Sequence, residues 1–136
     1  MDYQSSISQD ILSRFCEGIK KFNEGDFFEC HDILEDIWFE IRGGSRNFYQ
    51  GLIQAAVGFY HITVRNNTKG ALSQLKKGTV KLNGYKPEFQ GVELDHFLER
   101  INECIALIEK SNEGSHIKFP VKKIPKILFD RKKFVL

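Results

Sequence analysis

The chain has 136 residues, of which 41% are hydrophobic and 28% charged, and its net charge is +2. These values predict one globular domain with its own core and exclude a wholly disordered chain. No apolar run approaches the roughly 18 residues of a membrane span, and the polar first ten residues carry no signal-peptide pattern. The cysteines lack a C-x-x-C spacing, which indicates reduced thiols in a cytoplasmic protein rather than a zinc site. They are Cys16, Cys30 and Cys104.

The charge is unevenly distributed along the chain. Residues 116–136 carry seven Lys or Arg against one Asp, whereas residues 1–115 carry 13 basic and 17 acidic residues. A mildly acidic body with a basic tail does not by itself predict a nucleic-acid-binding face.

The first two predicted helices form a hairpin. Apolar residues at helical spacing mark the first helix, and Gly25 is expected to end it because glycine readily takes a left-handed conformation. Asp26 opens the second helix, and Glu29 completes a capping-box-like pair. Because so few residues connect the two helices, we expect them to be antiparallel. The apolar residues of the first helix are Ile11, Leu12, Phe15, Ile19 and Phe22.

The third predicted helix is the central one. The second helix is expected to end at Gly43 and Gly44, and the third to run over about 45–66 with apolar residues on most of its circumference. A helix of that kind is surrounded by others. Small residues at helical spacing would let a neighbouring helix approach closely. They are Gly51, Ala55 and Gly58.

Two more helices complete a compact all-α array of about five helices. Thr68 is expected to cap the fourth helix. Residues 83–91 are predicted to be a turn-rich loop. Apolar residues from Leu94 to Ile108 mark the fifth helix. No strand is predicted.

The last 21 residues are set apart from the helical domain, which is assigned to residues 1–115. Residues 116–136 alternate lysine with apolar side chains, and their two prolines prevent a long helix. We expect an extended arm that packs on its own domain or on a symmetry mate. An arm for nucleic acid or an anionic membrane is the alternative.

Two polar stripes stand out among the helices. On the second helix, His31, Glu35, Trp38 and Arg42 fall on one face. On the third helix, otherwise apolar, polar residues fall within a similar arc. Helices joined by a short Gly-Gly-Ser link could bring the two stripes face to face. The polar residues of the third helix are Asn47, Gln50, Gln54, His61 and Arg65.

Three interpretations of these stripes remain open. His31 and Glu35 could form a buried hydrogen-bonded pair, since buried polar groups need partners. The stripes could instead line a ligand or partner pocket, with Trp38, Gln50, Gln54 and His61 as binding residues. As a third option, His31, Glu35 and His61 could hold zinc or manganese with an open position for hydrolysis, His31 and Glu35 then being the candidate catalytic residues.

Several stretches resemble a known family. "FNEGDFFECHDILEDIW", "FYQGLIQAAVGFYH" and "NNTKGALSQLKKG" resemble the family catalogued as domain of unknown function 309, over roughly residues 11–110. The resemblance implies an all-helical fold. The family has sometimes been labelled a predicted metal-dependent hydrolase, and the resemblance implies no more specific reaction. Asp32 stands where the family usually has glutamate. The family's motif residues correspond to His31, Glu35, Trp38, Gln50, Gly51, Gln54, His61, Gly70 and Ala71.

The sequence thus predicts a small cytoplasmic binding module of unknown biochemical function, with a polar pocket between its second and third helices. The alternative is a metal-dependent hydrolase that uses His31, Glu35 and His61. The expected partner is a small molecule or a protein, a second copy of the chain included.

Overall fold

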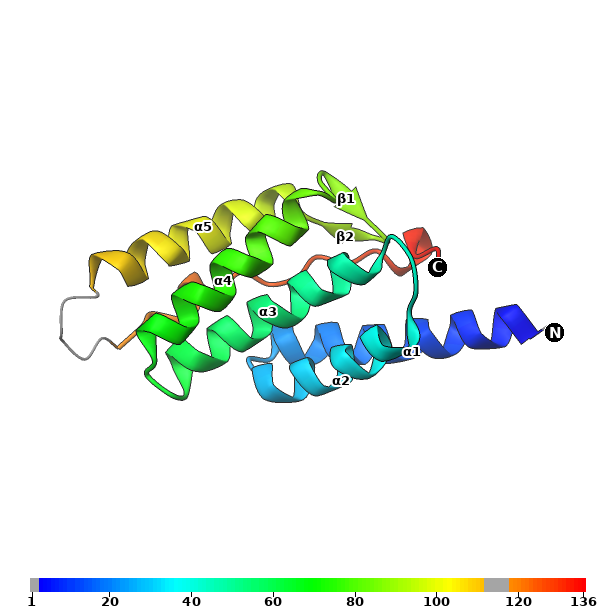
Figure 1. Ribbon diagram of the computed structural model, residues 1–136, viewed down its shortest axis with the longest axis horizontal. Helices are drawn as coiled ribbons and strands as arrows, with labels where there is room; N and C mark the ends of the chain where they lie inside the picture. The colour runs from blue at the N-terminus through cyan, green and yellow to red at the C-terminus, as the bar shows by residue number, and fades with distance from the viewer. Residues whose placement is uncertain (1–2, 112–117) are drawn as a thin grey trace.

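The computed structural model describes residues 3–111 and 118–136, and its architecture is all-α (Figure 1). The helices in these ranges are α1 (Tyr3–Asn23), α2 (Phe27–Glu40), α3 (Arg46–Thr63), α4 (Thr68–Asn83) and α5 (Asp95–Lys110). A small antiparallel sheet, β1 (Glu88–Phe89) and β2 (Val92–Glu93), and two 3-10 turns, η1 (Val121–Lys123) and η2 (Arg131–Lys133), complete the described elements. The predicted fold class, a compact array of five helices, is confirmed.

The α1–α2 hairpin follows from its glycine. Gly25 has a φ of +84°, a backbone conformation that residues with a side chain rarely adopt. The two helices run antiparallel beside each other (Figure 1). Asp26 is the N-cap of α2, but its side chain forms no capping hydrogen bond, so the predicted capping box is wrong. Helix α2 ends at Glu40, ahead of the predicted Gly43.

Helix α3 packs against α2 on one side and against α4 on the other. The α3–α4 crossing is close because glycines face each other there. A Cβ atom on Gly78 would lie 2.9 Å from the carbonyl oxygen of Gly51, and one on Gly58 would lie 2.6 Å from the Leu75 side chain. The predicted close approach to the small residues of α3 is confirmed. The residues of α3 that are buried are Phe48, Tyr49, Gly51, Leu52, Ile53, Gln54, Ala55, Ala56, Gly58, Phe59 and Ile62.

Two local predictions are wrong. Asn67, not Thr68, is the N-cap of α4, because the Asn67 side chain accepts a hydrogen bond from the Gly70 amide. The prediction of no strand is also wrong, because the turn-rich segment 83–91 contains β1. The turn that follows β1 is formed by Gln90 and Gly91, with φ of +49° and +87°. Two successive residues of positive φ are typical of a tight hairpin turn.

The C-terminal arm, residues 118–136, lies along the bundle between α5 and α1 and reaches the β-hairpin (Figure 1). Asn23 of α1 both donates to and accepts from the backbone of Ile127, at 3.0 and 2.7 Å. Phe129 forms a bridge with Val92 of β2, and the Asp130 amide donates to the Gly91 carbonyl at 2.8 Å. The predicted division at 115/116 falls outside the described residues and stays a prediction.

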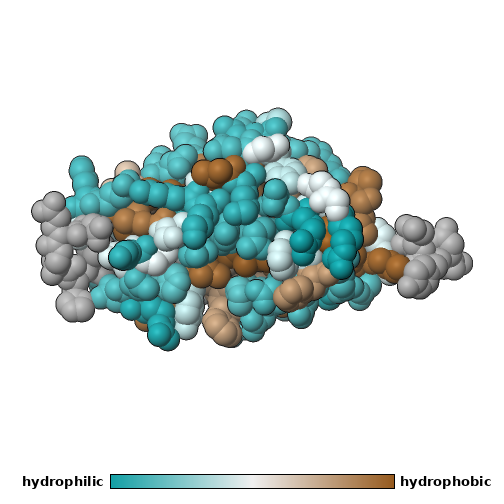
Figure 2. Space-filling view, in the orientation of Figure 1, coloured by the Kyte–Doolittle hydropathy of each residue, from teal (hydrophilic) through white to brown (hydrophobic). Residues whose placement is uncertain are grey.

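The molecule's surface is mixed. Hydrophilic side chains cover most of the face in Figure 2, and hydrophobic ones appear there as separate patches. Among the described residues, no helix combines the length and the apolar character that crossing a bilayer demands.

Candidate functional site

One face of α2 is buried, and this fixes which side chains face outward. Phe27, Cys30, Leu34 and Ile37 are at most 4% exposed and anchor the helix in the core. The partly exposed side of α2, next to its buried face, contacts α3 at two points. We call this surface the α2–α3 face. It consists of Phe28, His31, Asp32, Glu35, Trp38 and Phe39 on α2 and of Arg46, Tyr60 and His61 on α3.

His31 lies between two carboxylates of its own helix. Its Nε2 is 3.2 Å from Glu35 Oε2, and its Nδ1 is 3.1 Å from Asp32 Oδ1. The side chain of His31 is 23% exposed and that of Glu35 is 42% exposed. The pair is therefore a partly solvated contact, less buried than the pair that the sequence predicted. The Nδ1 contact with Asp32 lacks hydrogen-bond geometry.

Trp38 of α2 and Arg46 of α3 form one of the two contacts between these helices. The Arg46 guanidinium carbon lies 3.9 Å from the centre of the Trp38 ring, a cation–π arrangement. One terminal nitrogen of Arg46 is also 3.5 Å from the Trp38 carbonyl oxygen. Arg46 was missing from the predicted site. Its position at the first turn of α3 becomes informative only when the packing of α2 on α3 is known.

Aromatic rings connect the two histidines. The ring of Phe28 lies 5.7 Å from His31 and 5.5 Å from Tyr60, and Tyr60 lies 6.2 Å from His61. His31 and His61 thus belong to one chain of ring contacts, with Phe28 and Tyr60 as the intermediate members. Neither Phe28 nor Tyr60 was among the predicted site residues, because aromatic side chains at helical spacing usually belong to a core.

The α2–α3 face also holds unsatisfied polar atoms. Within the described residues, four buried side-chain nitrogens have no hydrogen-bond partner, and three belong to this face: His31 Nδ1, Arg46 Nε and His61 Nδ1. The fourth is Arg14 Nε. A buried polar atom without a partner costs about 1–3 kcal/mol, so the α2–α3 face is less well satisfied than the rest of the described interior.

The two predicted glutamines differ in their surroundings. The Gln54 side chain is buried and accepts a hydrogen bond from Lys81 Nζ of α4 at 2.9 Å. It therefore belongs to the α3–α4 contact. Gln50 is partly buried, and its side chain forms no hydrogen bond with another residue of the described ranges. His31 thus contacts Glu35 on α2 and Trp38 contacts Arg46 of α3, whereas Gln54 belongs to a different pair of helices.

The three predicted metal ligands, His31, Glu35 and His61, form no cluster of three within the described residues. In residues 3–111 and 118–136, no three His, Cys, Asp or Glu side chains come together in a way that could hold a metal ion. Asp32 and Glu35 contact opposite ring nitrogens of His31, so the three groups do not converge on one point. The zinc or manganese site on His31, Glu35 and His61 stays a prediction.

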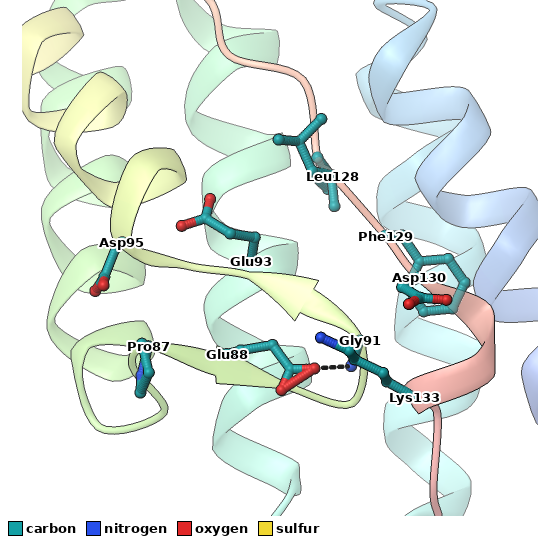
Figure 3. Close-up of a pocket in the computed structure, with 10 residues that line it drawn as sticks. Pro87, Glu88, Gly91, Glu93, Asp95, Leu128, Phe129, Asp130 and Lys133 are labelled. Atoms are coloured by element: carbon teal, nitrogen blue, oxygen red, sulfur yellow. Dashed lines mark hydrogen bonds between the residues drawn. The ribbon is translucent and has the colours of Figure 1, made fainter.

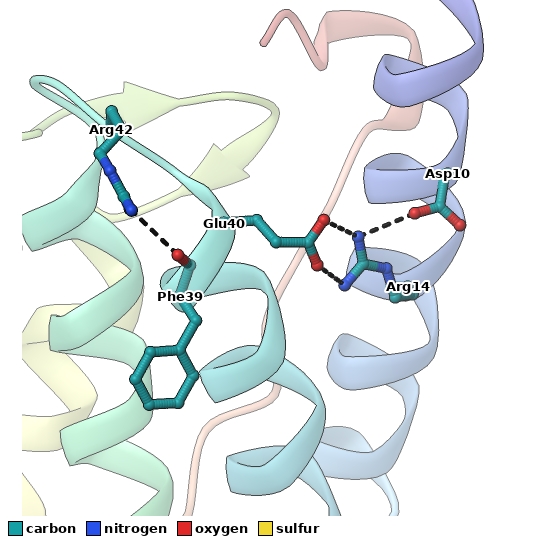
Figure 4. A network of polar contacts seen from close by, with 5 residues as sticks. All are labelled: Asp10, Arg14, Phe39, Glu40 and Arg42. Carbon is teal, nitrogen blue, oxygen red and sulfur yellow. Dashed lines mark hydrogen bonds and ion pairs between the residues drawn. The ribbon is translucent and has the colours of Figure 1, made fainter.

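The far end of α2 is fixed by arginines (Figure 4). Arg14 of α1 contacts both carboxylate oxygens of Glu40 and is 2.8 Å from Asp10. The Glu40 carboxylate raises the pKa of the Arg14 guanidinium. Arg42, predicted to share the polar stripe, instead donates to the Phe39 carbonyl at 3.0 Å, while the Phe39 ring points away from this network.

The exposed side of α2 is both acidic and aromatic. The segment Phe27–Glu40 contains five Asp or Glu and no Lys or Arg. Phe28 is 52% exposed and Phe39 is 59% exposed. Except for Glu40 with Arg14, none of these carboxylates forms an ion pair with a Lys or Arg of the described residues. The carboxylates are Glu29, Asp32, Glu35, Asp36 and Glu40.

Comparison with known proteins gives a family and two curated relatives. Residues 15–74 match the model described as Domain of unknown function (DUF309). The uncharacterized protein YpuF of Bacillus subtilis (strain 168) is 34% identical over 100 residues, which is 71% of this chain and 57% of YpuF. An uncharacterized protein of Aquifex aeolicus (strain VF5) is 27% identical over 106 residues, 74% of this chain and 32% of that protein. The matched region therefore covers less than two thirds of either relative. The predicted resemblance is confirmed: over residues 15–74 this chain is similar to the DUF309 family.

Proposed function

We propose that this chain is a binding module whose α2–α3 face receives a basic, apolar segment of a protein partner. The observation that carries the proposal is the combination on α2 of two half-exposed phenylalanines with carboxylates, such as that of Glu35, that pair with no Lys or Arg in the described part of the chain. Exposed aromatic side chains of this kind are typical anchors of protein interfaces. Unneutralised carboxylates beside them favour a partner with Lys or Arg, since opposite charges steer association and fix the register.

The spacing of the anchors suits a partner segment of about three helical turns. Phe28 and Phe39 are 11 positions apart in α2, or about 16 Å at 1.5 Å per residue. Asp32 and Glu35 lie between the two phenylalanines in the sequence. A partner helix with apolar residues at both ends and a basic residue between them would match this pattern. The unsatisfied nitrogens of His31 and His61 offer further hydrogen bonds once side chains adjust on binding.

A pair of synthetic helical peptides tests the proposal. Both carry the same apolar residues; one has lysines and the other has glutamates on the flanking positions. We expect isothermal titration to show binding of the lysine peptide and no binding of the glutamate peptide. Phe28→Ala and Glu35→Gln should each weaken its binding by about three- to tenfold.

Two matched variants control for unspecific effects. Val80 is 74% exposed on α4, and Glu99 is exposed on α5, so Val80→Ala and Glu99→Gln remove similar groups far along the chain from α2. Both should bind the peptide as the wild type does. Equal binding of the two peptides, or no binding of either, would contradict a protein-binding face of this polarity.

A metal titration addresses the hydrolase alternative. Zinc and manganese are titrated into the wild type, His31→Ala and Glu35→Gln, with heat and melting temperature as readouts. If the proposal is right, metals leave the melting temperature unchanged. Without metal, Glu35→Gln should then lower the free energy of unfolding by no more than about 1 kcal/mol, because the His31–Glu35 contact is partly solvated. Stabilisation by metal that is lost in both variants would favour the hydrolase instead.

A further inference from the structure

The strongest unassigned feature is a basic hollow between α5 and the C-terminal arm. It has a volume of about 280 Å³. Its charged and titratable lining consists of His96 and Arg100 from α5 and of Lys122, Lys123 and Lys126 from the arm. No carboxylate of residues 3–111 or 118–136 lines it. Ile124, Pro125 and Leu128 supply the apolar part of the wall. We call this the arm pocket.

The positive charge of the arm pocket is poorly neutralised. None of its three lysines forms an ion pair within residues 3–111 and 118–136. Arg100 has one acidic contact, at 3.5 Å from Glu103, and its Nε is 3.4 Å from His96 Nε2. The guanidinium and the amines repel one another, and an anion bound among them would relieve that repulsion.

A second hollow, on the hairpin side of the arm, provides a contrast (Figure 3). Its charged lining consists of four carboxylates, those of Glu88, Glu93, Asp95 and Asp130, and one amine, that of Lys133. These carboxylates already have local partners: Glu88 accepts from the Gly91 amide, Glu93 from the His96 amide and Asp130 from the Lys132 amide, while Asp95 is 3.7 Å from Lys86. Its acids are therefore explained by turns and a helix cap, whereas the lysines of the arm pocket have no such local role.

We propose that the arm pocket binds a small phosphate-bearing molecule. A guanidinium can hold two phosphate oxygens at once, and lysine amines supply further charge. The volume lies just below the range of about 300–1,000 Å³ that is usual for ligand sites, which favours a phosphate or diphosphate on a short body over a full nucleotide. Leu128, 58% exposed, offers that body an apolar contact.

The sequence places these groups together by the course of the arm. Pro120 and Pro125 bracket Lys122 and Lys123, and Lys126 directly follows Pro125. The 3-10 turn η1 forms the first turn of this segment. The Lys123 carbonyl oxygen accepts a hydrogen bond from the Cys104 thiol of α5 at 3.4 Å. This contact holds the arm against α5, so Arg100 and the lysines belong to one side of the molecule.

The test measures binding of pyrophosphate and of propyl phosphate to the full chain by isothermal titration and melting temperature, with sulfate at matched ionic strength. Both phosphates should bind saturably and raise the melting temperature more than sulfate does. Arg100→Gln should weaken binding by about tenfold or more, since it removes a charged hydrogen-bond donor. Lys126→Gln should weaken it severalfold. Lys77→Gln, an exposed lysine of α4 outside the pocket, should bind as the wild type does.

Three results would overturn the proposal. One is the absence of saturable binding by either phosphate. Another is an equal loss of affinity in Arg100→Gln and Lys77→Gln, which would mean a diffuse charge effect. The third is much tighter binding of a single-stranded oligonucleotide or of phosphatidylserine vesicles, with a steep salt dependence, because it would identify the arm as a surface for a polyanion. These measurements do not involve the α2–α3 face, so they are independent of the proposed function.

Discussion

At the scale of single residues, the polar side chains of the two predicted stripes find their partners in different places. Gln54 and His31 come from the two predicted stripes, yet Gln54 binds Lys81 of α4 while His31 contacts the carboxylates of its own α2. Each choice lowers the cost of keeping a polar side chain away from water. The spacing of residues on one helix predicts which side chains can share a face. It does not predict which neighbouring helix will supply their hydrogen-bond partners.

The buried thiols give a prediction about pH. Burial raises the pKa of Cys30 to about 12 and that of Cys104 to about 11, whereas an unfolded thiol titrates near 8.5, an ordinary value. Above that pH the unfolded chain loses these protons first, so the folded state binds more protons and its stability falls as pH rises. The loss is at most about 1.4 kcal/mol per pH unit for each thiol. Below pH 8 the contribution is fully present.

Urea denaturation at pH 8, 9 and 10 checks this expectation. The free energy of unfolding should fall over this series, and it should fall less steeply in Cys30→Ala. A native-state reaction with a thiol reagent at pH 8 should label the partly exposed Cys16 before Cys30 and Cys104. Early labelling of Cys30, or identical pH slopes for the variant and the wild type, would contradict the argument.

At the scale of helices and strands, the sequence predicted what depends on long periodic patterns. All five helices were expected because each carries a regular apolar face that must be buried. The β1–β2 hairpin was not predicted, because strands of two residues are too short to show an alternating pattern. Its formation depends on the arm as well, through the Val92–Phe129 bridge, which joins residues far apart in the chain. The cap at Asn67 was misplaced by one residue because Asn and Thr are both good capping residues.

The α3–α4 crossing gives a prediction about glycine. A Cβ on Gly78 would lie 2.9 Å from the Gly51 carbonyl oxygen and 3.2 Å from the Ala55 amide nitrogen. These atoms are backbone, so the two helices would have to move apart. We expect Gly78→Ala to lower the free energy of unfolding by about 1–3 kcal/mol despite the higher helix propensity of alanine.

Gly44 provides the matched control in a urea denaturation series. Its φ is not in the left-handed region, and a Cβ there would meet nothing within 4 Å. Gly44→Ala should therefore be neutral or stabilise the protein by up to about 1 kcal/mol, through the unfolded state. A Gly78→Ala protein as stable as Gly44→Ala would show that the helices can separate at no cost.

At the scale of the whole molecule, the arm connects the first and last helices. It is held to α5 by the Cys104–Lys123 contact, to α1 by Asn23 and to β2 by Phe129. The tail's basic and apolar composition predicted an arm, but not its path, because a segment without periodicity has many surfaces on which it could pack. The same holds for the α2–α3 face, where Arg46 and Tyr60 contact α2 only after the chain has folded.

The arm should therefore be part of the cooperative fold. Ile127 is 3% exposed, and its backbone exchanges two hydrogen bonds with the Asn23 side chain. We expect Ile127→Ala to cost about 2–4 kcal/mol, the usual range for a buried isoleucine. Val121 lies in the same arm but is 62% exposed, so Val121→Ala should change the free energy of unfolding by no more than about 0.5 kcal/mol. Truncation after Ser115 removes every arm contact at once and should lower the melting temperature more than Ile127→Ala does. Calorimetry of the four proteins, with the oligomeric state checked by light scattering, measures these effects.

One outcome would contradict the cooperative role of the arm. If the truncated protein has the melting temperature and the oligomeric state of the wild type, the arm adds nothing to the fold, and Ile127→Ala should then leave the free energy of unfolding unchanged.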